Sequence, residues 1–177
     1  MTNSRLKLRN VVAIVASFVI CVMLSGCGGN GKIKMTTVAN GKVGFSIFGT
    51  GNVIVDWGDG SEKVMLNLDD LESIEHGIAI EHTYQSEKIC TITVKGDSIM
   101  MFNIHYDTQL TSLDVKNNST LESISCQNNN FTVDALNTLF KTLHSNNIEN
   151  KIIYISNNPG ADDCDRSIAE RKGWIVR

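Results

Sequence analysis

The chain has 177 residues, of which 16 are Lys or Arg and 19 are Asp or Glu, giving a formal net charge of −3. Hydrophobic residues make up 42% of the chain and only one residue is proline, a composition that argues against a disordered stalk. An acidic chain without runs of basic residues is a poor candidate for binding nucleic acid or for peripheral binding to anionic lipid. This length fits one hydrophobic core of ordinary size or two small ones.

The N-terminal segment predicts export and lipid attachment. Arg5, Lys7 and Arg9 precede an apolar run over residues 11–24, which ends in Leu-Ser-Gly-Cys at Cys27. A basic start, a short apolar run and a small-residue end are typical of a secretory signal, and the run is too short to span a membrane as a helix. The last four residues resemble the lipobox of bacterial lipoproteins, in which the cysteine is acylated and becomes the new N-terminus.

This resemblance implies that residues 1–26 are removed and that Cys27 carries the lipid. The chain would then be tethered in the cell envelope, at the outer membrane or cell surface, because buried acyl chains hold a domain at a bilayer. The alternative is an ordinary cleaved signal in which Cys27 has no special role. The glycine-rich residues 27–32 predict a flexible tether between membrane and folded domain.

Three cysteines remain beyond Cys27, namely Cys90, Cys126 and Cys164. An odd number of thiols without close spacing is typical of neither a disulfide framework nor a zinc site. Free cysteine behaves as a small hydrophobic residue. We therefore expect buried thiols.

Residues 33–96 are expected to form a small β unit. Val43, Phe45 and Ile47 alternate with small or polar residues, and residues 53–55 are a short β-branched run. The segment 49–52, Gly-Thr-Gly-Asn, lies between them and predicts a hairpin turn.

Two further motifs in this unit are Trp57-Gly58-Asp59-Gly60 and His82-Thr83-Tyr84. They resemble the WGDG-like turn and the H-x-Y segment of the polycystic kidney disease (PKD) type β-sandwich, although the segment between them is not typical of that family. Asp59 and Gly60 suit a tight turn in which the carboxylate accepts bonds from nearby amides. A calcium site at Asp56 and Asp59 is the weaker alternative, because two carboxylates are too few ligands.

The second half, residues 97–177, carries a repeat with the form apolar-x-x-apolar-x-apolar-x-x-Asn/Asp. Successive sets start 11 residues apart. The sets are Ile99, Phe102, Ile104 and Asp107; Leu110, Leu113, Val115 and Asn118; and Leu121, Ile124, Cys126 and Asn129. They resemble the short leucine-rich repeats of surface proteins in the Bacteroides group.

Each repeat is too short to form a whole coil of a solenoid. A fully extended segment of this length reaches only ~36 Å, whereas leucine-rich coils need about 20 to 29 residues. We therefore predict two repeats per coil, with residues 99–107 and 121–129 side by side as parallel strands and residues 110–118 on the other face. Asn118 and Asn129 are expected to bond backbone amides in the turns.

The last coil is longer. Leucines and a phenylalanine at helical spacing predict a helix over residues 133–144 with Thr132 as its N-cap. A strand should follow, and then a second helix that starts at Asp162 or Asp163, runs to Lys172 and stops at Gly173. The strand residues are Ile153, Ile155 and Asn158, with a terminal strand at 174–176. The β unit and the final helix would cap the two ends of the stack.

The overall expectation is an α+β, mostly β chain, with a PKD-like β-sandwich followed by a short leucine-rich-repeat solenoid. No catalytic motif, cofactor site or metal-ligand cluster is recognised, so the chain is predicted not to be an enzyme. The parallel strands would present a polar ladder as a candidate binding face for a protein or peptide. Its members are Met101, Asn103, His105, Ser123, Ser125 and Gln127.

The alternative function is glycan binding, as an accessory to polysaccharide uptake. Sugar sites commonly use exposed aromatic platforms, but this chain has 6% aromatic residues. Trp57 and Trp174 both have positions that suit a core. No nucleic-acid partner is expected.

Overall fold

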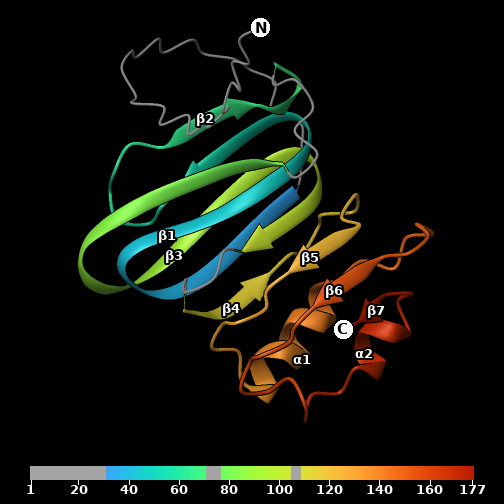
Figure 1. The fold of residues 1–177 in the computed structure, drawn as a ribbon. Coiled ribbons are helices and arrows are strands. Elements are labelled where there is room, and N and C mark those ends of the chain that lie inside the picture. Colours follow the sequence, from blue (N-terminus) through green and yellow to red (C-terminus); the bar gives the residue numbers. More distant parts are fainter. Residues whose placement is uncertain (1–30, 71–76, 105–108) are drawn as a thin grey trace, which may run out of the picture.

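The computed structural model describes residues 31–70, 77–104 and 109–177 (Figure 1). The predicted signal peptide, Cys27 and the candidate face residue His105 lie outside the described residues. Gly31 and Lys32 were predicted to belong to the tether, but they begin the first strand, because they pair with Gly96 and Lys95.

The described residues form one mixed, open sheet with two short α-helices, so the predicted mostly β, α+β class is confirmed. The elements are β1 (Gly31–Asp56), β2 (Val64–Asn67), a 3-10 turn η1 (Leu68–Asp70), β3 (Ile78–Ile104), β4 (Leu110–Asp114), β5 (Ser123–Ser125), α1 (Val133–Thr142), β6 (Ile152–Tyr154), α2 (Ser167–Glu170) and β7 (Ile175–Val176). The strand order is β2-β1-β3-β5-β6-β7, with β4 paired to β1.

The two long strands β1 and β3 bend, so the sheet folds into two layers (Figure 1). The first layer contains, in order, β4, residues 31–39 of β1, residues 88–96 of β3, residues 53–56 of β1, and β2. The second layer contains residues 78–84 of β3, residues 41–50 of β1, residues 98–104 of β3, and then β5, β6 and β7.

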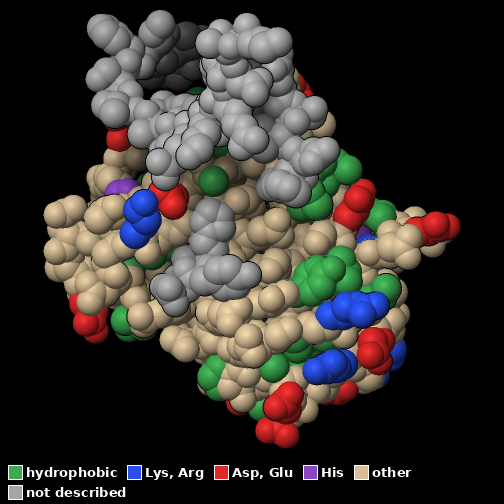
Figure 2. Space-filling model, in the orientation of Figure 1, with side chains coloured by type: hydrophobic (Ala, Val, Ile, Leu, Met, Phe, Trp, Pro, Cys, Tyr) green, Lys and Arg blue, Asp and Glu red, His purple; other side chains and the backbone are tan. Residues whose placement is uncertain are grey.

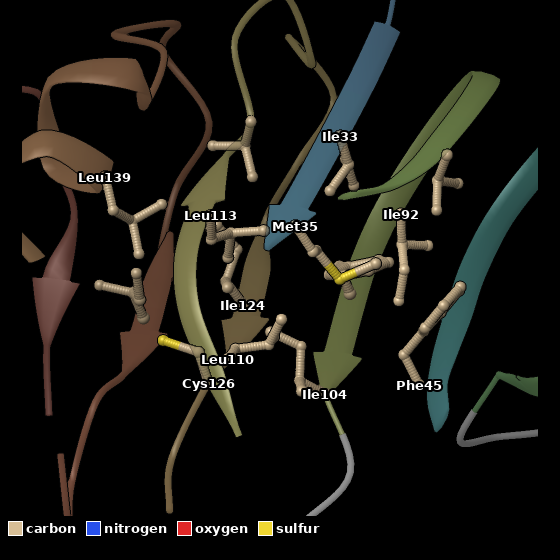
Figure 3. Packing of buried hydrophobic residues seen from close by; sticks show 14 of the residues in the cluster. Ile33, Met35, Phe45, Ile92, Ile104, Leu110, Leu113, Ile124, Cys126 and Leu139 are labelled. Atoms are coloured by element: carbon tan, nitrogen blue, oxygen red, sulfur yellow. The ribbon is translucent and has the colours of Figure 1, made fainter. Parts of the chain in front are cut away.

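The hydrophobic core lies between the two layers. Successive side chains of a strand point to opposite faces, so alternate residues of each strand enter the interior. In Figure 3, Met35 and Ile92 from the first layer share this interior with Ile104 and Ile124 from the second. Because both layers bury their inner faces against each other, their outer faces lie on opposite sides of the molecule.

The predicted hairpin at residues 49–52 is wrong. β1 continues through this segment, with Gly51 at a φ of +77° and a shift in pairing register between Thr50 and Val53. Gly49 allows a close approach, since a Cβ there would lie 2.0 Å from the carbonyl oxygen of Ser98. The glycines therefore produce a bulge that carries β1 from one layer to the other.

β3 runs through the boundary expected between residues 96 and 97. Residues 88–96 pair with β1 in the first layer, and residues 98–104 pair with β1 and β5 in the second. The buried side chains on both sides of this boundary belong to one cluster. The N-terminal and C-terminal halves are thus joined through a strand and a shared interior.

The predicted parallel pairing of the repeats is observed. Met101, Phe102 and Asn103 of β3 pair in parallel register with Ser123, Ile124 and Ser125 of β5, and β6 and β7 continue the stack. All the predicted inward apolar positions are buried: Ile99, Phe102, Ile104, Leu110, Leu113, Val115, Leu121, Ile124, Cys126, Ile153 and Ile155. The sequence did not predict that β4 pairs antiparallel with β1.

Pairs of asparagines shape the turns after the repeat strands. The first residue of each pair, Asn117, Asn128 or Asn157, has a positive φ between 55° and 66°. Asparagine tolerates this left-handed conformation better than most residues. The second residue, Asn118, Asn129 or Asn158, is buried and bonds the backbone.

The side chain of Asn118 donates to the carbonyl oxygens of Val115 and Lys116, whereas Asn129 and Asn158 bond both carbonyl and amide groups, as Asn158 illustrates. Its Nδ2 donates to the carbonyl oxygens of Cys126 and Ile155, and its Oδ1 accepts from the backbone N–H of Phe131. Asn129 likewise accepts from the N–H of Leu110, which is the bond to an amide that the sequence predicted. These side chains tie neighbouring coils together.

The C-terminal coil follows the prediction only in part. Helix α1 begins after Thr132, whose hydroxyl accepts from the N–H of Ala135, as predicted. The expected long second helix is wrong: only Ser167–Glu170 is helical, and neither Asp162 nor Asp163 caps it. Asp165 instead accepts from the N–H of Ser167 within a turn. No helix in the described part of the chain combines the length and the apolar character needed to cross a bilayer.

Candidate binding face

The outer face of the second layer carries the predicted polar ladder. Met101 lies beside Ser123, and Asn103 lies beside Ser125, because β3 and β5 pair in parallel register. Gln127 lies two residues after Ser125 in the chain. All five side chains are partly exposed, as expected for a face turned away from the core. We call these five residues the repeat face.

Sequence reasoning missed the neighbours that extend the repeat face on both sides. Phe48 and Ser46 of β1 pair with Met101 and Asn103. On the other side, Ile152 and Tyr154 of β6 pair with Ser123 and Ser125, and Ile175 of β7 pairs with Ile152. The sequence indicates the outward position of Ile152 and Tyr154, because both flank the buried Ile153 of the third repeat.

The extended face therefore has one row rich in apolar side chains and one polar row. The first row contains Phe48, Met101, Ser123, Ile152 and Ile175, so one serine interrupts its apolar side chains, and the polar row contains Ser46, Asn103, Ser125 and Tyr154. None of these side chains carries a charge at neutral pH. Ile175 is 42% exposed, and hydrophobic side chains reach the surface in Figure 2 in the region where Figure 1 places β5, β6 and β7. This face offers apolar contact area and uncharged hydrogen-bonding groups.

A second cluster surrounds the Trp57-to-Gly60 turn. His82 Nε2 lies 2.7 Å from Asp59 Oδ2, and the imidazole stacks on the Trp57 ring at 4.9 Å between centroids. The buried Tyr84 hydroxyl donates to the carbonyl oxygen of Trp57. Bonds from Ser61 to Asp59, together with the His82 contact, hold the pKa of the Asp59 carboxyl far below its usual range.

The hydrogen bonds of this cluster are made within the turn and to the strand that packs on it. The Ser61 hydroxyl donates to Asp59 at 2.6 Å, rather than to the imidazole. Asp56 accepts from the N–H of Gly58 and pairs with Lys63, so its oxygens are also engaged. Within the described ranges, no three His, Cys, Asp or Glu side chains are grouped as metal ligands. The three thiols are free and buried.

His144 joins the last coil to the repeat stack. Its Nε2 lies 2.7 Å from the carbonyl oxygen of Leu121, and its Nδ1 accepts from the N–H of Asn146. The ring meets the edge of Trp174, whose indole N–H donates to the His144 carbonyl. Burial, with a smaller contribution from Lys151 and Lys172, lowers the pKa of this imidazole.

The described chain should lose stability as the pH falls below about 6.5. Folded His144 resists protonation, so the unfolded state binds more protons in this range, and its contribution to stability is present above that pH and lost below it. Urea unfolding at pH 7 and pH 5 measures the loss. In His144→Gln the difference between the two pH values should be smaller, and an unchanged difference would show that another group titrates.

No protein family model, curated protein or solved structure matches this chain.

Proposed function

We propose that the chain is a cell-envelope lipoprotein, anchored through lipid on Cys27, that acts as a non-catalytic binding module. In this proposal residues 33–96 correspond to a PKD-like β-sandwich and residues 97–177 to a short leucine-rich solenoid. A protein or peptide partner binds on the repeat face, and the lipid anchor holds the domain at the outer membrane or cell surface. Neither a cofactor nor a nucleic acid is involved.

One observation supports the binding role: the in-register parallel strands present a face whose side chains are uncharged. Its polar row offers hydroxyl and amide groups at Asn103 and Ser125, next to the partly exposed Tyr154. Interfaces commonly combine aromatic and apolar contact area with a limited number of hydrogen bonds. The parallel register and the asparagine turns support the assignment to leucine-rich repeats.

Ser125→Arg tests the repeat face, because Ser125 lies at its centre. A buried unpaired charge opposes binding, so capture of the partner should fall by at least about tenfold. The measurement is quantitative mass spectrometry of proteins retained from envelope extract by the purified mature protein. Thr91→Arg is the matched control, because Thr91 is exposed on the outer face of the first layer. Equal capture by both variants would place the binding site elsewhere.

The glycan alternative has little support from the tryptophans, since Trp57 and Trp174 are each only 2% exposed. Tyr154 and Phe48, which flank the repeat face on either side, are the partly exposed aromatic side chains that could stack on a sugar. A glycan array with the mature protein separates the two functions. Saturable binding to one class of sugar, lost in Tyr154→Ala, would favour glycan binding over a protein partner.

A further inference from the structure

We propose that one end of the first layer's outer face rests on an anionic bilayer surface and turns the repeat face away from the membrane. This inference rests on the lipid anchor at Cys27 in the proposed function. The contact surface is a row of three lysines, Lys116, Lys32 and Lys95, followed by Ile54 and Met65. We call it the lysine row.

The row is assembled by strand pairing. Lys32 of β1 lies directly opposite Lys95 of β3, so both side chains are on the same face. Lys95 is also level with Ile54, because Ile54 pairs with Lys95 on one side and with Met65 on the other. Four adjacent sheet positions are therefore occupied by two cations and two apolar side chains.

Lys116 extends the row on the opposite side. Asp114 of β4 pairs with Lys34, so the chain beyond it passes Lys32. The Asn118 amide confirms this placement, since it donates to the carbonyl oxygens of both Lys32, at 3.0 Å, and Lys116, at 3.2 Å. Lys32 and Lys95 therefore lie on neighbouring strands, and the backbone of Lys116 lies beside that of Lys32 in the turn that follows β4.

Within the described residues, the charges of the row are not balanced by ion pairs. Like charges directly opposite each other on adjacent strands are destabilising. Among the described residues, none of the three lysine side chains forms an ion pair with a carboxylate, and Lys95 and Lys116 are exposed. The nearest carboxylates in the pairing are Asp114, opposite Lys34 in the next row, and Asp56, which pairs with Lys63. An external anion would relieve the repulsion.

The apolar end of the row points to a bilayer rather than to a soluble anion. Met65 is 69% exposed and continues the row beyond Ile54. Surfaces that lie on membranes combine basic residues, which attract anionic headgroups, with apolar residues that enter the interface. A soluble phosphate would not require the exposed methionine.

The tether brings this surface to the membrane. The row starts one residue after Gly31, and only four peptide bonds separate Gly31 from the proposed acylated cysteine. Extended chain of that length spans at most about 14 Å. The screening length for charges is about 8 Å at physiological salt, so a partly extended tether leaves the lysines within reach of the headgroups. The anchor and the charges therefore act on the same end of the molecule.

This orientation has a consequence for binding. The lysine row is on the outer face of the first layer and the repeat face is on the outer face of the second, and the core lies between them. When the lysine row contacts headgroups, the repeat face is directed to solvent. The arrangement keeps the proposed partner site open while the domain is held close to the bilayer.

Amine labelling of the mature protein on vesicles tests the proposal. Vesicles of phosphatidylcholine are compared with vesicles that also contain phosphatidylglycerol, at low and high salt, and labelling of each lysine is read by mass spectrometry. Each lysine near an anionic surface contributes roughly a fivefold gain in binding, so labelling of Lys95 and Lys116 should fall severalfold on the anionic vesicles. High salt should restore it. Lys88 and Lys141, exposed but away from the row, should be labelled equally on both.

Two double variants provide a second test of the lysine row. Lys95→Gln with Lys116→Gln should abolish the lipid dependence of Lys32 labelling, whereas Lys88→Gln with Lys141→Gln should preserve it. Equal labelling of the wild-type row on neutral and anionic vesicles would overturn the proposal. So would a lipid dependence that survives in the row variant.

Flotation of the same samples separates the proposal from the anchor. If the protein floats with neutral vesicles but shows no charge-dependent protection, the result supports the lipid anchor and contradicts contact of the lysine row with the membrane. If the protein floats only with anionic vesicles, and no longer floats after the row substitutions, the result supports the lysine row and contradicts the lipid anchor. Protein that floats with neither vesicle type contradicts both.

Discussion

Replacement of Phe102 by alanine is expected to lower the free energy of unfolding by about 3–5 kcal/mol. Phe102 is completely buried where β3 enters the second layer, and its ring lies 5.1 Å from that of Phe45 between centroids. Truncation would leave a cavity at the place where β1, β3 and β5 meet. Urea denaturation followed by far-UV circular dichroism measures the loss.

Phe48→Ala is the matched control for this prediction. Phe48 is an aromatic residue of β1 that pairs with Met101 on the outer face and is partly exposed. Its truncation removes less buried area, so the loss should be clearly smaller. Equal losses in the two variants would mean that the interior between the layers is not closely packed.

Replacement of Asn158 by alanine is the second large effect, with an expected loss of about 2–4 kcal/mol. The substitution leaves two carbonyl oxygens and the N–H of Phe131 without their buried partner. Asn157→Gly is the control from the same pair: Asn157 has a φ of +59°, which glycine adopts easily, so its loss should be small. A small loss in Asn158→Ala would show that water replaces the amide in the turn.

The sequence predicted the parts of the fold that are local or periodic. The repeat spacing placed Phe102 and Ile124 side by side, because residues at equivalent positions of a repeat occupy equivalent positions in the stack. The asparagine turns followed from the same register. Helix α1 followed from its apolar spacing and from Thr132 at its start.

The parts that depend on distant pairing were not predictable from one sequence. The pairing of Lys34 with Asp114 joins strands 80 residues apart in the chain, and no local pattern marks it. The same holds for Ser46 beside the repeat face and for Lys116 beside Lys32. Glycine is common both in hairpin turns and in β-bulges, so the glycine-rich segment around Gly51 predicts a hairpin although β1 forms a bulge there.

The lysine row also qualifies the conclusion drawn from net charge. An acidic chain without basic runs argues against binding to anionic lipid, and the linear sequence contains no such run. Strand pairing nevertheless brings Lys32 and Lys95 together, because cross-strand neighbours are independent of sequence distance. Overall charge and local charge are therefore separate quantities in this fold.

The central claim is that both halves of the chain share one interior and unfold together. Each half contains one buried tryptophan, Trp57 or Trp174, so the variants Trp174→Phe and Trp57→Phe report on the first and second half respectively. Urea unfolding of each variant should give the same midpoint by tryptophan fluorescence and by far-UV circular dichroism, since one cooperative unit has one transition. A fluorescence midpoint that differs from the circular dichroism midpoint in either variant would contradict the shared core.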